Sequence, residues 1–197
     1  MTRLMHDKEF DAFRLVGGTS LALQMRHRIS VDLDLFSSEP FSEQRLREYL
    51  ERNYGLQTDY MSPCTLKGEI DGIQIDCIAH QYPWLESPYI EEDIRLAGME
   101  DICAMKLNAI AGNGTRIKDF IDIAWLSSRF SLNQMLDFYE SKYHANALMP
   151  LKALVYFDDI NFDEPVRLID GKKVNWKSYE KRLLQMEKYP NKIFEAI

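Results

Sequence analysis

Residues 15–36 read LVGGTSLALQMRHRISVDLDLF, and this stretch decides the fold of the chain. Its pattern predicts a short apolar strand, a glycine pair, a short helix and a second strand that carries two acids. Gly17 and Gly18 lack a Cβ, so the backbone there can turn tightly and approach a ligand closely. We expect either Thr19 or Ser20 to cap the helix, whose N-terminus would offer free N–H groups to a phosphate.

The second strand carries an acid pair, Asp32 and Asp34, which alternates with aliphatic residues. In a strand this alternation places both carboxylates on one face and the aliphatic side chains on the other. Neighbouring carboxylates repel each other, and Mg²⁺ relieves the repulsion because it prefers oxygen ligands and shares its shell with substrate phosphates. A phosphate-binding turn beside such a pair indicates phosphoryl or nucleotidyl transfer. The alternative is a surface turn followed by a strand with a solvated acidic face.

Together these residues resemble a known family. The glycine turn at 17–20, a spacer, and Asp-x-Asp at 32–34 between apolar residues are similar to the signature of the DNA polymerase β-type nucleotidyltransferase superfamily. The fuller string, with Leu-Ala-Leu at 21–23 and His-Arg-x-Ser at 27–30, resembles the AbiEii/AbiGii toxin branch, the toxic half of toxin–antitoxin or abortive-infection pairs. The resemblance implies an α/β (α+β) fold: a nucleotidyltransferase-type mixed sheet flanked by helices, followed by a C-terminal helical half.

A third acid follows in the next group of strands, which we expect near residues 56–61, 64–70 and 73–80, with Asp71-Gly72 as a hairpin turn. Asp76 lies in an otherwise apolar strand, where an acid without a partner is costly. In the resembled superfamily a third carboxylate stands beside the acid pair, and Asp76 is the only acid so placed. The resemblance therefore implies Asp32, Asp34 and Asp76 as ligands of Mg²⁺ or Mn²⁺, with Asp76 also able to draw the proton from the acceptor. Exposure to water on an edge strand is the alternative for Asp76.

A lysine, Lys106, interrupts an apolar helical face that runs from Met99 to Ile110. Such a lysine either extends out of the packing or faces an anion. The region resembles the family's second signature, with Asp-x-x-x-x-Lys-x-x-Ala at 101–109 and Arg-x-Lys-Asp-x-x-Asp at 116–122. The resemblance implies that Lys106 contacts a phosphate or activates the nucleophile.

In the next expected helix, Lys118, Asp119 and Asp122 share one flank. They form either a surface ion-pair ladder or, by the resemblance, the rim of the catalytic cleft. In the second case Asp119 or Asp122 orients Lys106 or serves as base, and the spacing does not choose between them. The resemblance also implies nucleotide binding by Gly17, Gly18, Thr19, Ser20, Arg28 and Lys118.

The length of 197 residues indicates one domain or a catalytic domain with an appended helical half, which we divide at residues 1–95 and 96–197. No apolar run approaches the roughly 20 residues of a membrane helix, and the N-terminus lacks the apolar segment of a signal peptide, so we expect a cytoplasmic protein without membrane contact. The 3 cysteines are widely spaced and indicate neither a disulfide framework nor a zinc knuckle.

Helical spacing and helix-end signals predict further helices outside the motifs. We expect one over residues 6–13 with Phe10 and Phe13 turned inward, and one that Ser42 caps and Gly55 ends. We also expect two helices within residues 131–157 and a last helix over residues 175–189.

The net charge of −7 argues against a dedicated non-specific nucleic-acid binder. Residues 171–197 nevertheless carry 7 Lys or Arg against 3 Glu. This basic segment could hold one end of an RNA, or it could be a solvated amphipathic helix.

The resemblance implies transfer of NMP from a Mg-bound NTP to an acceptor hydroxyl, with release of pyrophosphate. The acceptor it favours is RNA, with the tRNA 3′ end as a target, and a cognate antitoxin is the expected protein partner. A small-molecule acceptor such as an aminoglycoside is an alternative. A catalytically idle module that binds nucleotide or antitoxin is another.

Overall fold

The computed structural model describes residues 1–197 and divides into two compact units. Unit 1 comprises residues 1–20 and 30–98, and unit 2 comprises residues 21–29 and 99–197. The division expected from the sequence ended the first part at residue 95 and kept residues 21–29 within it. Each unit is described by itself below.

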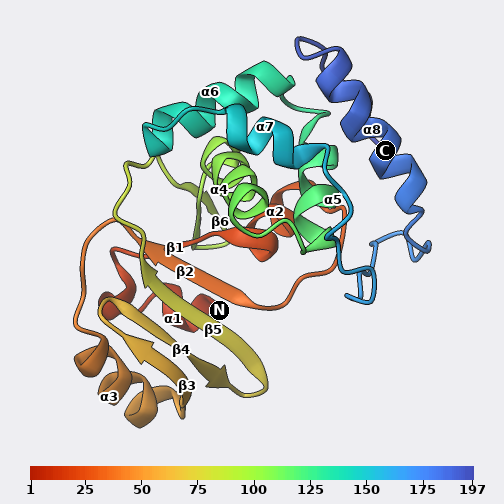
Figure 1. The fold of residues 1–197 in the computed structure, drawn as a ribbon. Helices are drawn as coiled ribbons and strands as arrows, with labels where there is room; N and C mark the ends of the chain where they lie inside the picture. Colours follow the sequence, from red (N-terminus) through yellow and green to blue (C-terminus); the bar gives the residue numbers. More distant parts are fainter. The chain divides into compact units, whose positions relative to one another are not determined.

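Unit 1 is built on a seven-stranded mixed sheet with the strand order β3-β4-β5-β2-β1-β7-β6 (Figure 1). The strands are β1 (Arg14–Leu15), β2 (Leu33–Ser37), β3 (Gln57–Ser62), β4 (Thr65–Ile70), β5 (Ile73–Ala79), β6 (Tyr89–Glu91) and β7 (Ile94–Leu96). Strand β2 runs parallel to β5, and β1 runs parallel to β7, while the other neighbours are antiparallel. The mixed sheet expected from the resemblance is therefore confirmed.

The helices of unit 1 form where the sequence carries helix start and stop signals. They are α1 (Thr2–Met5), a 3₁₀ turn (Lys8–Phe10) and α3 (Glu43–Tyr54), while α2 (Gly17–Met25) begins in unit 1. Ser42 caps α3 by accepting the Arg45 N–H at 3.3 Å, and Gly55 ends it in the left-handed conformation, both as predicted. The helix expected over residues 6–13 is wrong, because only the 3₁₀ turn forms there.

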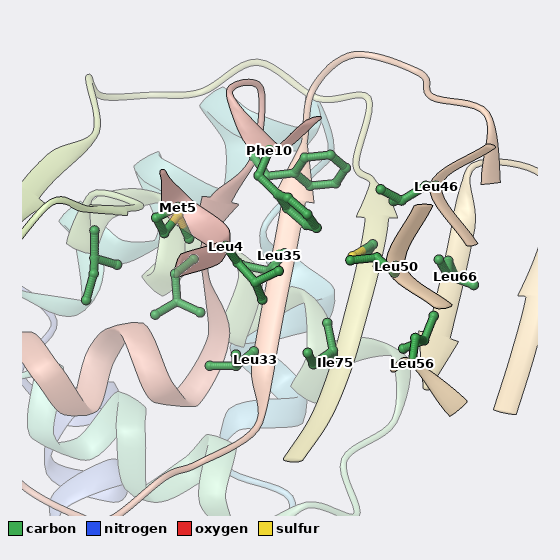
Figure 2. Close-up of a cluster of buried hydrophobic side chains, with 14 of the residues drawn as sticks. Leu4, Met5, Phe10, Leu33, Leu35, Leu46, Leu50, Leu56, Leu66 and Ile75 are labelled. Carbon is green, nitrogen blue, oxygen red and sulfur yellow. The ribbon is translucent and has the colours of Figure 1, made fainter. Parts of the chain in front are cut away.

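The apolar residues of the strands gather on one face of the sheet and form the core of unit 1. Figure 2 shows Leu33 and Leu35 of β2 and Ile75 of β5 in this cluster, together with Leu46 and Leu50 of α3. Because side chains alternate along a strand, the residues between them face the opposite side of the sheet. Those intervening residues include two acids, Asp34 of β2 and Asp76 of β5.

A tight hairpin sets the register of β4 against β5. Asp71 and Gly72 have φ angles of +52° and +80°, which are the positive values that a two-residue type I′ turn requires. The turn pairs Ile70 with Ile73, and the ladder continues outward without a shift. This hairpin confirms the prediction made from the Asp-Gly pair.

Strands β6 and β7 were not predicted. We expected an irregular segment at residues 82–88 and helix after about residue 95. Each of these strands has three residues, and β7 forms by pairing with β1, where Leu96 lies opposite Leu15. So short a strand leaves no periodic pattern, and its partner is far away in the sequence.

Unit 2 is helical, as expected. It contains α4 (Met99–Gly112), α5 (Ile117–Leu126), α6 (Leu132–Tyr143), α7 (Leu148–Leu154) and α8 (Trp176–Lys188). Helix α4 packs against α5, α6 and α7, and α8 packs against α5 (Figure 1). The helix pair expected in residues 131–157 and the last helix expected over residues 175–189 are confirmed. None of the helices has the length and apolar character needed to cross a membrane.

Candidate active site

The glycine turn of unit 1 lies directly against the acid-bearing strand β2. Gly17 has a φ of +66°, and a Cβ at this position would collide with the side chain of Asp34. The Val16 N–H donates to the Asp34 carbonyl at 2.8 Å, so the backbone just before the turn is fixed to β2. Glycine is therefore required here both by the backbone conformation and by the close approach to the acid.

Helix α2 begins at the glycine pair itself, at Gly17. The expectation that Thr19 or Ser20 caps it is wrong, because both residues lie inside the first turn. The Thr19 hydroxyl donates instead to the Asp32 carbonyl at 2.5 Å. This bond fixes the backbone that leads into β2, while the N–H groups of a first helical turn have no acceptor within the helix.

Two of the predicted acids lie side by side. Asp34 of β2 and Asp76 of β5 are register partners in parallel strands, so their side chains share one face at the strand spacing of about 4.8 Å. Asp76 is also the register partner of Lys67 on β4, whose ammonium group forms an ion pair with it. Because β5 has β2 and β4 on its two sides, the edge-strand alternative for Asp76 is wrong.

The third acid, Asp32, lies just before β2 and is exposed. No three His, Cys, Asp or Glu side chains are arranged as a complete set of metal ligands. The residues present nevertheless fit Mg²⁺ or Mn²⁺, because the adjacent Asp34 and Asp76 supply oxygen ligands, and Mg²⁺ usually takes one or two carboxylates together with substrate phosphates. The Lys67 ammonium group already shows where a positive charge is favoured.

A second group of charged residues, which we call the buried cluster, lies inside unit 2. It consists of His27, Arg28, Lys106, Asp119 and Asp122. Arg28 donates from Nε to Asp122 Oδ1 at 2.7 Å and from a terminal nitrogen to Oδ2 at 2.8 Å. Lys106 Nζ lies 2.6 Å from Asp119 Oδ1 and 2.8 Å from Asp122 Oδ2, and His27 Nε2 lies 2.8 Å from Asp122 Oδ1.

Three members of the buried cluster, Arg28, Lys106 and Asp122, have pKa values shifted in the direction that favours their charged forms. Burial alone would raise the pKa of Asp122, but Lys106, Arg28 and His27 outweigh it and hold this pKa well below its usual range. Burial likewise favours a neutral Lys106, but Asp122 and Asp119 overcome this and raise its pKa. The pKa of Arg28 is raised as well, because Asp122 more than offsets burial.

The surface-ladder alternative for Lys118, Asp119 and Asp122 is wrong, because both aspartates are fully buried. Lys118 lies apart from them and pairs with Glu164 at 3.1 Å. The two aspartates also differ from each other. Both oxygens of Asp122 have partners, whereas Asp119 Oδ2 is buried without a hydrogen-bond partner and lies 3.9 Å from Arg116 Nε.

Sequence reasoning missed Lys67, although a signal for it was present. A two-residue turn at Asp71-Gly72 fixes the whole ladder, and counting outward from Ile70 and Ile73 brings Lys67 opposite Asp76. The sequence marks His27 only as part of the family motif at residues 27–30. Its contact with Asp122 joins residues 95 positions apart, and no local pattern predicts it.

Unit 2 also contains a cavity of about 280 Å³ beside the buried cluster. Its wall includes His27 and Trp125, whose ring centroids lie 5.7 Å apart. Arg26, Lys172 and Lys173 also line it, and so does Asp170, which forms an ion pair with Lys172 at 2.9 Å. The His27 Nδ1 atom is buried and has no hydrogen-bond partner. An aromatic wall with several cations nearby is suited to an anionic ligand with a planar part.

The mixed sheet, the glycine turn against β2 and the adjacent acids define a nucleotidyltransferase, and comparisons with known proteins agree. The family model of the AbiEii nucleotidyl transferase toxins of type IV toxin–antitoxin systems matches residues 1–195. The chain therefore belongs to this family of nucleotidyltransferase toxins. Membership implies an antitoxin as partner.

Individual relatives extend this result. An uncharacterized protein of Aquifex aeolicus (strain VF5) is 34% identical over 154 residues, which cover 75% of this chain and 74% of the relative. A Helicobacter pylori crystal structure described as a nucleotidyltransferase superposes with a TM-score of 0.59 at 17% identity, covering 96% of this chain and 89% of the other. The crystal structure of JHP933 from Helicobacter pylori superposes with a TM-score of 0.55 at 16% identity, covering 96% of this chain and 86% of the other. These two likenesses concern the fold.

Proposed function

We propose that this toxin transfers a nucleoside monophosphate from an NTP to a hydroxyl group of RNA, with Mg²⁺ or Mn²⁺, and releases pyrophosphate. The observation that carries the proposal is the placement of Asp34 beside Asp76, with the Gly17 backbone packed against Asp34. A phosphate-binding turn next to paired carboxylates is the arrangement that phosphoryl and nucleotidyl transfer require.

Each residue of the unit 1 site has a role in this proposal. The backbone N–H groups of Gly17, Gly18 and Thr19 hold the β- and γ-phosphates at the start of α2, because the Ser20 N–H already donates to the Val16 carbonyl at 3.3 Å. Asp32, Asp34 and Asp76 hold the divalent cation, which when bound neutralises charge on the triphosphate. Asp76 in addition accepts the proton of the acceptor hydroxyl. The Thr19–Asp32 hydrogen bond keeps the first acid in place.

For the buried cluster, the contacts favour distinct roles for the two aspartates. Asp122 is unsuited to act as a base because its pKa is held well below the usual range. Asp119 orients Lys106 and retains an oxygen that can accept one more hydrogen bond. The raised pKa of Lys106 keeps its ammonium group positively charged. The role we assign to this charge is contact with a phosphate. Arg28 acts only through its charge, because its guanidinium is bound to Asp122.

RNA is the acceptor that the charges of unit 2 favour, with the tRNA 3′ end as the proposed target. The basic segment at residues 171–197 carries Lys172 and Lys173, which also line the cavity beside Trp125. Phosphates pair with lysine and arginine, and bases stack on aromatic rings, so such a surface suits a single strand.

The test is to incubate the purified protein with each α-³²P-labelled NTP, Mg²⁺ and total RNA. We expect label in RNA with at least one NTP. We also expect that Asp32→Asn abolishes labelling and that Asp11→Asn, an exposed acid elsewhere in unit 1, leaves it unchanged.

Three results would contradict the proposal in different ways. Label in an aminoglycoside but never in RNA would mean that the acceptor is a small molecule and not RNA. NTP binding without release of pyrophosphate would favour an idle binding module. Full activity of Asp32→Asn would show that the acid assignment is wrong.

A further inference from the structure

We propose that Lys67 is the protein's own counter-ion at the acid site: in the metal-free protein its ammonium group occupies Asp76, and a divalent cation that binds Asp76 has to displace it. Lys67 is then a positioning residue that sets how tightly the site holds metal. The inference rests on the proposed function only in taking Asp34 and Asp76 as the cation site.

The backbone fixes the order of the three charged groups. Lys67 on β4, Asp76 on β5 and Asp34 on β2 are successive register partners, so they form a row across three neighbouring strands. Asp76 stands between the other two. Its carboxylate is therefore within reach of the ammonium on one side and beside the Asp34 position on the other.

The Lys67 side chain competes for the atoms that a metal needs. Its Nζ forms an ion pair with Asp76 Oδ2, one of the two oxygens that this residue can give to a cation. A divalent cation brought to the same carboxylate would experience repulsion from the ammonium group at close range. Metal and lysine therefore cannot both use Asp76 fully.

The lysine is also able to leave. The Lys67 side chain is 39% exposed and that of Asp76 is 24% exposed, so a path to solvent exists for the ammonium group. Lysine has a flexible four-carbon stem and a strongly hydrated head, and water readily replaces an exposed ion-pair partner. Asp76, by contrast, lies on an interior strand and stays in place.

This arrangement makes the metal site conditional on nucleotide. Without NTP the ammonium group satisfies Asp76, and a cation gains little by entering. An NTP supplies phosphate oxygens as additional ligands, which favours the metal over the lysine. We therefore expect weak metal binding by the protein alone and stronger binding in the presence of nucleotide.

The experiment measures Mn²⁺ binding by the full-length protein without nucleotide or RNA, from the EPR signal of free Mn²⁺. Removing one positive charge beside the cation in Lys67→Gln should tighten Mn²⁺ binding by about tenfold. Lys67→Met is a second neutral variant and should do the same, while Lys67→Arg keeps the charge and should bind as the wild type does. Lys8→Gln, an exposed lysine elsewhere in unit 1, is the matched control and should change nothing.

A double-variant comparison separates this role from a general effect of charge. In an Asp76→Asn background the Lys67→Gln change should lose its effect, because the carboxylate for which lysine and metal compete is gone. Thermal melts of all variants check that each is folded. If the folded neutral variants bind Mn²⁺ no more tightly than the wild type, including the case of no detectable binding, the proposal is overturned.

The result is independent of the transfer reaction. Tighter Mn²⁺ binding by Lys67→Gln in a protein that labels no RNA would support the counter-ion role and reject the proposed function. Unchanged Mn²⁺ binding by Lys67→Gln in a protein that does label RNA would reject the counter-ion role and support the proposed function.

Discussion

Two lysines of this protein are paired with aspartates, and they are paired in different ways. Lys67 in unit 1 has one aspartate partner and a side chain that is 39% exposed. Lys106 in unit 2 has two aspartate partners, Asp119 and Asp122, and Asp122 also binds Arg28 and His27. The Lys106 side chain is only 7% exposed. The first pair can open and admit another cation, whereas the second holds its charges in a closed network.

The difference follows from the cost of burying charge. An exposed ion pair contributes about 0–1 kcal/mol and can be broken at little cost. A buried charge left without its partner costs several kcal/mol, so removing one member of a buried network lowers the free energy of unfolding much more than breaking an exposed pair does. We therefore expect changes at Asp34 and Asp76 of unit 1 to affect mainly the transfer rate. We expect changes in the buried cluster of unit 2 to affect mainly stability.

The largest effect is expected for Asp122→Asn in the buried cluster. The amide cannot balance Arg28 and Lys106, so the free energy of unfolding should fall by about 3–5 kcal/mol. Urea unfolding followed by circular dichroism measures it. The matched control is Lys118→Gln, which breaks a partly exposed pair with Glu164 and should cost less than about 1 kcal/mol. Equal small losses in both variants would contradict the closed-network description.

Asp34→Asn should show the opposite behaviour. We expect the rate of nucleotide transfer to fall by about a hundredfold to a thousandfold, because a carboxylate that would hold the divalent cation is lost. The melting temperature should stay near that of the wild type, since the amide keeps the shape of the side chain. Transfer assays and melting curves on the same preparation check this. A variant that melts at a clearly lower temperature but retains its transfer rate would contradict the assignment of Asp34 to the reaction.

Gly17→Ala tests the contact between the glycine turn and the acid strand. The new Cβ would collide with the Asp34 side chain at a φ of +66°, so we expect a loss of about 1–3 kcal/mol in unfolding free energy. Gly112→Ala is the control, because no atom lies within 4 Å of its added Cβ. A neutral Gly17→Ala would mean that the turn does not lie against Asp34 as described.

The smallest effect is expected for moderate changes of pH. The pKa of Asp122 is lowered by folding, so its stabilisation is present above the unfolded value of about 4 and is lost as the pH falls towards the folded value. The raised pKa of Lys106 gives stability that is present below the unfolded value of about 10 and is lost only as the pH rises beyond it. Melting temperatures should therefore fall in acid, less steeply for Asp122→Asn than for the wild type. An equally steep fall in both proteins would contradict the lowered pKa of Asp122.

Local signals in the sequence predicted much of the fold. Ser42 and Gly55 bound α3, and Asp71-Gly72 forms the hairpin, because caps and turns depend on a few adjacent residues. Strands β6 and β7 could not be predicted in this way, since three-residue strands depend on partners such as Leu15 of β1. The helix expected over residues 6–13 shortened to a 3₁₀ turn, although Phe10 and Phe13 are buried as expected.

The candidate site also has a part that local sequence patterns predicted and a part that depends on distant partners. The side-by-side placement of Asp34 and Asp76 followed from strand alternation and the family resemblance, and the structure has it. The helical spacing put Asp119 and Asp122 on one flank, either in a surface ion-pair ladder or at the rim of the cleft, and it did not predict their full burial. Their burial depends on Arg28 and Lys106, cations from other parts of the chain, and no helical pattern reveals such partners.

The most direct test of the central claim is the position of the metal. A crystal of the protein soaked with Mn²⁺ and a non-hydrolysable NTP gives an anomalous difference map that locates the cation. We predict a Mn²⁺ peak bound to both Asp34 and Asp76, with Lys67 turned away from Asp76. A peak at any other carboxylates, with Lys67 still on Asp76, would contradict the account.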